Sequence, residues 1–270
     1  MKFDTLSDRM LYYRGLSEYR LMPRSYIMIM LDGRSFSTMI KNKFEKPFDD
    51  NFIEMMNQTA KYVCEQVPGS KLAYVQSDEI SIVVTDFESQ NSDSFFSFRL
   101  SKMLSIIAST ATAKFNNLMT QYMVSKLHHS DKAVLDAINE MPLYQFDCKC
   151  WNLPSYEDVF AWFLYRQIDC VRNSKQAAAQ ARISHKQLDS LNTDEQVNLL
   201  KDMTGIDWND YSEGKKYGRF IYREEVEFTT ETNEKYYRHY WLIHDAFRLT
   251  SDENYNGREN FDNLNVIPIR

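Results

Sequence analysis

The feature that most constrains the fold is a short apolar run that ends at a charged turn. Residues 26–31 carry no charged side chain and have the length of a single strand. Such a run is typical of a strand buried within a sheet. It stops at Asp32-Gly33, where glycine allows the backbone to turn sharply. The chain is therefore expected to be built around a sheet with helices packed against it.

Helical and strand patterns alternate along the first 150 residues. Helices are predicted over residues 4–19, which are amphipathic, 49–67, with Asp49 or Asp50 as the N-cap, and 94–127, as one or two segments. Strands are predicted over 72–76, 80–85 and 145–151, and the first two flank the bend Ser77-Asp78-Glu79. This order predicts an α+β fold whose sheet has helices packed on one face.

The second part of the chain is more helical. Helices are predicted over residues 155–181, 183–191 and 193–203. Residues 218–228 and 235–243 alternate as the strands of a long hairpin around Thr232-Asn233-Glu234, and 250–270 are expected to form an irregular tail. No linker is visible. We expect a core of residues 1–150 and a helical and β-hairpin part of residues 151–270 that packs on it.

Composition fits an ordinary globular protein and excludes a disordered tail, a collagen or a disulfide scaffold. Hydrophobic residues make up 43% of the chain, and four cysteines indicate a reducing compartment. No apolar run approaches about 18 residues, so no membrane-spanning helix is expected. The first ten residues lack an apolar signal segment. A cytoplasmic location is expected, with an organelle left open.

Charge is distributed unevenly along the chain. The net charge is −6, yet residues 94–130 contain four basic and no acidic side chains, whereas 224–270 contain ten acidic and five basic ones. A locally basic face on an acidic protein suits a selective polyanion site. Ordinary scatter of surface charge is the simpler explanation of the same pattern.

Carboxylates stand where predicted strands end. Asp32 follows the first strand, and Asp78-Glu79 lies at the bend between the next two. Neighbouring strands are about 4.8 Å apart, so carboxylates at the ends of adjacent strands can bind the same cations. Oxygen ligands without nearby His or Cys favour Mg²⁺, and the carbonyl of Gly33 can complete the shell. Acids at turns are also common as turn formers and helix caps.

Basic and hydroxyl residues accompany these acids. Lys46 precedes the helix that begins near Asp49, and a triphosphate is held by Lys or Arg together with N–H groups at a helix N-terminus. Ser77 can donate to a phosphate oxygen. Arg99 and Lys102 are spaced to share one helix face. Each of these residues, taken singly, also fits an exposed surface.

Three segments in order resemble the tRNA-histidine guanylyltransferase family, whose members polymerise nucleotides in the 3′-to-5′ direction. They are DGRSF at 32–36, FEKPFD at 44–49 and AYVQSDEIS at 73–81. The resemblance continues through RLSK at 99–102 and RQIDC at 166–170, so it covers roughly residues 5 to 225. It implies an antiparallel, palm-like core shared with forward polymerases.

The resemblance also implies the site. Asp32, the Gly33 carbonyl and Asp78 would hold two Mg²⁺ ions, with Glu79 in support. The residues that would bind nucleotide are Gly33, Arg34, Ser35, Phe36, Lys46, Asp49, Ser77, Arg99 and Lys102. The implied reaction is attack by a nucleotide 3′-OH on the 5′ end of tRNA, activated by an existing triphosphate or by ATP adenylylation. ATP and GTP are the implied substrates, and a homotetramer is the implied assembly.

One departure concerns the histidine-specific role. Family enzymes that add G to histidine tRNA carry HINNLYN after the RQxDC motif, whereas residues 171–177 here read VRNSKQA. Only Asn173 survives, and Val171 replaces the imidazole. Ser37 also stands where His is usual, and Val75 where Gly is usual. The pattern resembles the Thg-like branch, which repairs truncated tRNA 5′ ends by templated addition.

Two alternatives stay open from the sequence. One is addition of G at position −1 of histidine tRNA. The other is a non-catalytic palm-fold protein that binds RNA or nucleotide, and a palm-fold cyclase is a related case. Weaker candidates for contacts with RNA or a second nucleotide are Arg172, Asn173, Lys215 and Lys216, for which a solvated helix face or surface loop is the competing explanation.

Overall fold

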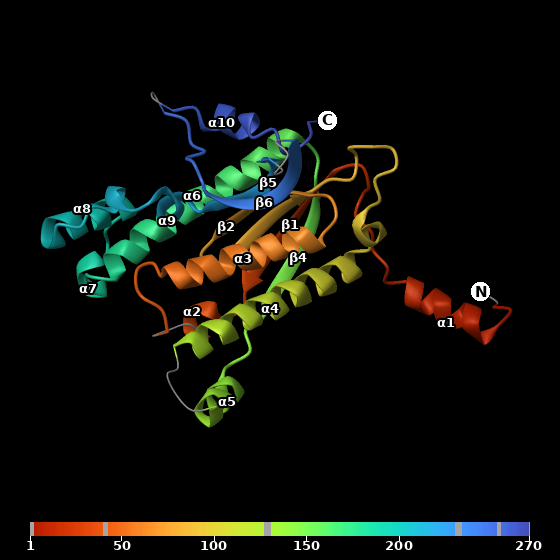
Figure 1. Ribbon diagram of the computed structural model, residues 1–270, viewed down its shortest axis with the longest axis horizontal. Coiled ribbons are helices and arrows are strands. Elements are labelled where there is room, and N and C mark those ends of the chain that lie inside the picture. Colours follow the sequence, from red (N-terminus) through yellow and green to blue (C-terminus); the bar gives the residue numbers. More distant parts are fainter. Residues whose placement is uncertain (1–2, 40–42, 127–130, 230–233, 253–254, 270) are drawn as a thin grey trace.

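The molecule is organised around one six-stranded antiparallel sheet (Figure 1). The computed structural model describes residues 3–39, 43–126, 131–229, 234–252 and 255–269. The strand order is β4-β1-β3-β2-β5-β6. The strands are β1 (Tyr26–Gly33), β2 (Ser70–Gln76), β3 (Glu79–Val84), β4 (Phe146–Leu153), β5 (Arg219–Thr229) and β6 (Lys235–Asp245).

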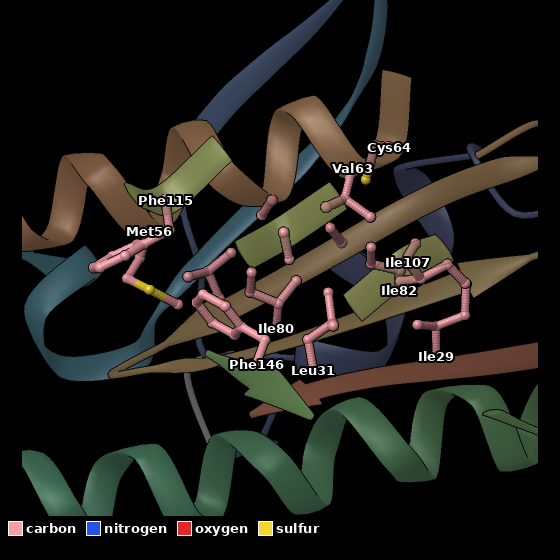
Figure 2. Packing of buried hydrophobic residues seen from close by; sticks show 14 of the residues in the cluster. Ile29, Leu31, Met56, Val63, Cys64, Ile80, Ile82, Ile107, Phe115 and Phe146 are labelled. Atoms are coloured by element: carbon pink, nitrogen blue, oxygen red, sulfur yellow. The ribbon is translucent and has the colours of Figure 1, made fainter. Parts of the chain in front are cut away.

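Two long helices cover one face of this sheet. They are α3 (Asp50–Gln66) and α4 (Leu100–Ser125). Figure 2 shows side chains of α3, among them Met56 and Val63, pointing toward Ile80 and Ile82 of β3. Asp49 caps α3 as predicted, since its carboxylate accepts from the N–H groups of Asn51 and Phe52. The two long helices of the first 150 residues thus pack on a single face, as the sequence indicates.

The opposite face is covered by the C-terminal part. Helix α6 (Tyr156–Gln180) and the short α10 (Gly257–Asn263) pack there around Phe163 and Phe261. Alternate residues of β1 serve the two cores, with Ile27 facing α3 and α4 and Met28 facing α6. Because both faces are buried, β1 is apolar throughout instead of alternating. The division at residue 150 stays a prediction, although β5 pairs directly with β2 and joins both parts in one sheet.

A small helical cluster extends the C-terminal half of α6. It contains α7 (His185–Leu188), α8 (Thr193–Thr204), the 3₁₀ turn η2 (Trp208–Asp210) and α9 (Glu213–Tyr217). Leu188, Leu200 and Trp208 form its core with Ala178 and Ala179 of α6. The predicted helix over 183–191 is therefore shorter than expected. The other short elements are α2 (Phe36–Met39), η1 (Phe95–Phe98) and α5 (Asp131–Glu140), of which α5 is not predicted from the sequence.

The N-terminal helix differs from the prediction. Helix α1 (Leu6–Gly15) begins with a capping box between Thr5 and Asp8, but none of its ten residues, all described, is buried. The sequence predicts an amphipathic helix over residues 4–19. The helix forms, but the expectation that one of its faces packs against the rest of this single chain is wrong. Figure 1 shows α1 standing apart from the sheet. Local capping stabilises the helix start without any core contact.

The C-terminal segment also differs from the prediction. Residues 250–270 were expected to be irregular, but α10 forms there, capped by Asn256, and Phe261 is fully buried. The hairpin predicted around β5 and β6 is confirmed, while residues 230–233 at its turn lie outside the described residues. Among the described residues, no helix has the length and apolar character needed to cross a bilayer.

Candidate active site

Strand register brings the predicted carboxylates to one end of the sheet. Asp32 of β1 lies opposite Glu79 of β3 on one side and opposite Asp147 of β4 on the other. The N–H of Gly33 donates to the Asp78 carbonyl oxygen at 3.1 Å, which joins the end of β1 to the bend between β2 and β3. These acids, far apart in the sequence, therefore form one cluster. Asp147 had no local signal of its own in the sequence.

The cluster makes Asp32 difficult to ionise. Burial is the main cause that raises the pKa of Asp32 to about 6, followed by repulsion from Asp78, Glu79 and Asp147, while Lys149 acts in the opposite direction. Burial also raises the pKa of Asp78, and the hydrogen bond from the Ser77 hydroxyl at 3.0 Å partly offsets this rise. Closely held carboxylates with raised pKa values are typical of sites that bind a cation.

The raised pKa of Asp32 predicts a pH dependence of stability in metal-free protein. The folded state keeps a proton on Asp32 that the unfolded chain releases near pH 4, so this group's stabilisation is present below about pH 4 and is lost by about pH 6. The measurement is chemical unfolding from pH 4 to 7 in chelator, for wild type and Asp32→Asn. Stability of the wild type relative to the variant should fall across this window. Parallel curves would contradict the assignment.

The residues present fit a magnesium site of the kind that the sequence predicts. Among the described residues, no three Asp, Glu, His or Cys side chains converge on one point. The candidate set is instead the carboxylates of Asp32 and Asp78 with the Gly33 carbonyl. Mg²⁺ is commonly held by one or two carboxylates, with water and substrate phosphate completing its shell. The mutual repulsion around Asp32 is the observation that a bound cation would relieve.

Glu79, the cross-strand neighbour of Asp32, is bound by a cation on α6. Arg166 forms a short ion pair with Glu79 through Nη2 and bonds Asp169 through Nη1 at 2.9 Å. The Gln76 side chain donates to the same Glu79 carboxylate at 2.8 Å. Glu79 therefore supports the acidic end of the sheet through Arg166, which explains the arginine of the RQxDC motif.

The next residue of that motif secures the backbone on the other side of α6. The Gln167 side chain donates to the carbonyl oxygens of Tyr217 and Phe247, at 3.3 and 2.9 Å. It also accepts from the N–H of Leu249 at 2.6 Å. Gln167 is buried, so these bonds satisfy polar groups that water cannot reach. The motif thus ties α6 both to the acidic cluster and to the segment after β6.

The turn after β1 depends on close packing. A Cβ on Gly33 would lie 2.6 Å from the ring of Phe36, so no larger residue fits there without movement. Phe36 is buried against Phe115 and Phe146. Arg34 donates to the Gln145 side chain at 2.8 Å, and Ser35 has a positive φ of 57°. Of this predicted segment, Phe36 serves the core, whereas Arg34 and Ser35 are exposed.

A pocket of about 380 Å³ lies beside the acidic end of the sheet and collects predicted residues from three regions. Aromatic residues around the start of α3 form one wall, and α6 forms another. Among its lining residues are Lys46, Asp49, Ser77, Asp78, Asn173 and Lys215. The volume and the mixture of apolar walls with a few polar groups are those of a small-molecule site.

Lysine and carboxylate groups at the pocket have different local roles. The Asp49 carboxylate accepts N–H bonds from Glu45, Asn51 and Phe52, and these bonds outweigh burial and lower the pKa of Asp49. Lys215 pairs with Asp50 at 2.7 Å. Asp49 therefore fixes the start of α3, which leaves Lys46 and Lys215 as the predicted cations on the pocket lining.

Two residues that were predicted to bind nucleotide lie far from this pocket in the folded chain. Arg99 precedes α4 and pairs with Glu18 at 3.2 Å, and Lys102 lies over the ring of Phe96. The part of α4 next to Phe36 is at Phe115, about 20 Å further along the helix. Figure 1 shows the start of α4 at the end of the sheet away from α2. Arg99 is also outside the helix, so it does not share a helix face with Lys102.

The weaker candidates are divided between the pocket and other contacts. Asn173 and Lys215 line the pocket, as stated above. Arg172 pairs with Asp169 at 2.7 Å and is largely exposed. Lys216 is buried, donates to the Asn209 carbonyl at 3.0 Å and pairs with Glu213 at 2.8 Å, so its ammonium group serves the fold.

The antiparallel palm-like sheet ends in carboxylates beside a lysine-bearing pocket, an arrangement suited to an enzyme that transfers a phosphoryl or nucleotidyl group. Residues 8–154 match the sequence model of the Thg1 family, described as tRNAHis guanylyltransferase. This match covers more than half of the chain, and the chain belongs to that family.

Individual relatives agree with this assignment. The tRNA(His) guanylyltransferase of Neurospora crassa is 30% identical over 75% of this chain and 68% of its own length. A bacterial Thg1-like protein solved in complex with ATP is 32% identical with a TM-score of 0.73, covering 88% of this chain and 91% of its own. A structure of a bacterial Thg1-like protein with GTP is 31% identical with a TM-score of 0.71, covering 91% and 94%.

Proposed function

We propose that this nucleotidyltransferase repairs the 5′ ends of tRNAs by templated addition of nucleotides in the 3′-to-5′ direction. The observation that carries the proposal is the position of the run that departs from the histidine-specific pattern. Ser174 and Ala177, which both depart from that pattern, line the pocket that contains Lys46 and Asp78, beside the retained Asn173. The departure therefore alters the wall of the nucleotide pocket, where specificity for the added nucleotide and its tRNA partner would be set.

The chemistry proposed for the site is in-line phosphoryl transfer. Asp32, Asp78 and the Gly33 carbonyl would hold two Mg²⁺ ions, which would supply electrostatic stabilisation of the attacking and leaving oxygens. Lys46, Ser77 and Lys215 would orient the triphosphate. Arg166 would keep Glu79 fixed behind the metal ligands. The 5′ end would be activated either by its own triphosphate or by adenylylation from ATP.

Addition of G at position −1 of histidine tRNA is the second candidate. Its support is that relatives such as the Neurospora crassa protein carry the name tRNA(His) guanylyltransferase. The two candidates differ in what selects the incoming nucleotide. Repair selects it by pairing with the opposite tRNA strand, whereas the second function requires one particular tRNA. The tetramer and the cytoplasmic location stay predictions.

The test uses tRNAs that lack their first nucleotide, with each of the four bases opposite the gap, beside intact histidine tRNA. We expect the added nucleotide to follow the opposite base, and truncated substrates to be preferred by about tenfold or more in kcat/KM. Asp32→Asn, assayed in parallel, controls for contaminating activity. Preference for intact histidine tRNA, with G added whatever the opposite base, would reverse the ranking.

A further inference from the structure

Arg219 is a buried cation with one unused donor. It is the first residue of β5, lies opposite Val75 of β2 and is only 5% exposed. Its Nε donates to Asn57 Oδ1 at 3.0 Å, and its Nη1 donates to the Gly214 carbonyl at 3.2 Å. Within the described ranges, its Nη2 has no hydrogen-bond partner. A buried guanidinium nitrogen left without an acceptor is rare in a finished structure.

The charge of Arg219 is also left without a close counter-charge. Its two hydrogen-bond partners are a neutral amide and a backbone carbonyl. Asp245 and Glu54 are near enough to act on its charge, but neither forms an ion pair with it in the part of the chain described. Burial accordingly lowers the pKa of Arg219. A buried charge without a partner is strongly unfavourable, so this site is incomplete as it stands.

The surroundings indicate from which side the missing acceptor comes. Arg219 lines the 380 Å³ pocket together with Lys46, Ser77 and Asp78. A second hollow on its other side, of about 320 Å³, is lined by the acids Asp50, Glu54 and Asp245. Lys215 lines both hollows, and the larger pocket also holds the carboxylates of Asp49 and Asp78. Lys46 and Ser77 line only the larger pocket, which makes the pocket that the proposed function assigns to the nucleotide the better side for an anion to approach Arg219.

We propose that Arg219 binds a phosphate group of the nucleoside triphosphate in this pocket through Nη2. The inference rests on the proposed function, because it assigns one more contact to the same nucleotide. A carbonyl or ring nitrogen of a base would satisfy the hydrogen bond but would leave the charge uncompensated. A phosphate supplies both an acceptor and the missing negative charge, and arginine is the side chain best suited to it.

The test is the affinity of Arg219→Met for nucleotide, measured by calorimetric titration with MgGTP in the absence of tRNA. Loss of one charged hydrogen bond should weaken binding by about ten- to a hundredfold. Arg223→Met is the matched control, because Arg223 is an exposed arginine of the same strand that lines a different hollow. It should bind MgGTP like the wild type. Equal affinity of Arg219→Met and the wild type would overturn the proposal.

A second set of ligands identifies the group that is bound. MgATP and inorganic triphosphate should lose affinity for Arg219→Met by the same factor as MgGTP. A loss confined to MgGTP would show a contact with the base and would overturn the phosphate assignment. If the wild type bound none of these ligands, the proposed function itself would be contradicted. If the wild type and the variant bound them equally well, only the assignment of Arg219 would be overturned.

Stability separates ligand binding from a purely structural role. Arg219→Met removes an uncompensated buried charge but also the donors to Asn57 and Gly214, so the two effects on the unfolding temperature of the free protein oppose each other. The rise in that temperature on adding MgGTP should become smaller for a phosphate contact. A second outcome would show that Arg219 only joins α3 to α9. In that case Arg219→Met would be less stable or would fail to fold, and Arg219→Lys would bind nucleotide with unchanged affinity. For a phosphate contact, Arg219→Lys should bind with intermediate affinity, since lysine keeps the charge but not the planar fork.

Discussion

Replacing Asp32 by Asn is expected to lower the rate of nucleotide addition by at least about a hundredfold, with little effect on the fold. Asp32 lies at the centre of the acidic cluster, between Glu79 and Asp147, and is proposed to hold the metal ions. The amide keeps the shape of the side chain but loses the anionic oxygen. The measurement is the single-turnover rate on a truncated tRNA with saturating nucleotide and Mg²⁺.

Asp147→Asn is the matched control for this experiment. It removes one negative charge from the same cluster, but from an exposed residue outside the proposed metal ligands. Its rate should stay within about threefold of the wild type, since loss of a nearby exposed charge is a small effect. An Asp32→Asn enzyme with near-normal rate, or equal losses in both variants, would remove Asp32 from the metal site.

Replacing Arg166 by Met is expected to destabilise the protein by about 3 kcal/mol or more. Arg166 is buried and its guanidinium bonds both Glu79 and Asp169, so its removal leaves Glu79 without its cation and Asp169 with only the exposed Arg172. Activity should fall as well, because Glu79 is then free to move toward Asp32. Urea unfolding at neutral pH gives the change in the free energy of unfolding.

Arg172→Met provides the comparison, because Arg172 pairs with the same Asp169 from the exposed side of α6. Its loss should change stability by less than about 1 kcal/mol. Adding Glu79→Gln to Arg166→Met should recover part of the lost stability, since the unpaired charge is then removed. If the two arginine variants were equally stable, the buried network would not be the support described above.

The main elements of the fold could be predicted because their signals are local. The apolar run of β1, the capping of α3 by Asp49 and the bend at Ser77-Asp78 each lie within a few residues. Helix α10 was missed because its few apolar residues, such as Phe261, are separated by Asn and Asp. Helix α1 shows the opposite error, since an apolar spacing that favours a helix does not specify what the helix packs against.

The candidate site could be predicted only in part. The resemblance supplied Lys46, Ser77 and Asp78, and the pocket contains all three. It also supplied Arg99, which precedes α4 and lies far from the pocket, because order in the sequence does not give distance in the fold. Asp147 was missed since its position depends on register with β1. Arg219 was missed because a single arginine in an alternating strand usually indicates an exposed position.

The pairing of Asp32 with both Glu79 and Asp147 has a kinetic consequence. Each pairing closes a long loop, and the second spans nearly half of the chain. Such non-local contacts form late, after the entropy of loop closure has been overcome. A partly folded chain in which β1 has not paired with β3 therefore lacks the juxtaposition of Asp32 with Asp78 that the proposed metal site needs. Competence to bind divalent ions should then appear only once these strands have paired, so that ion binding reports on chains whose sheet has formed.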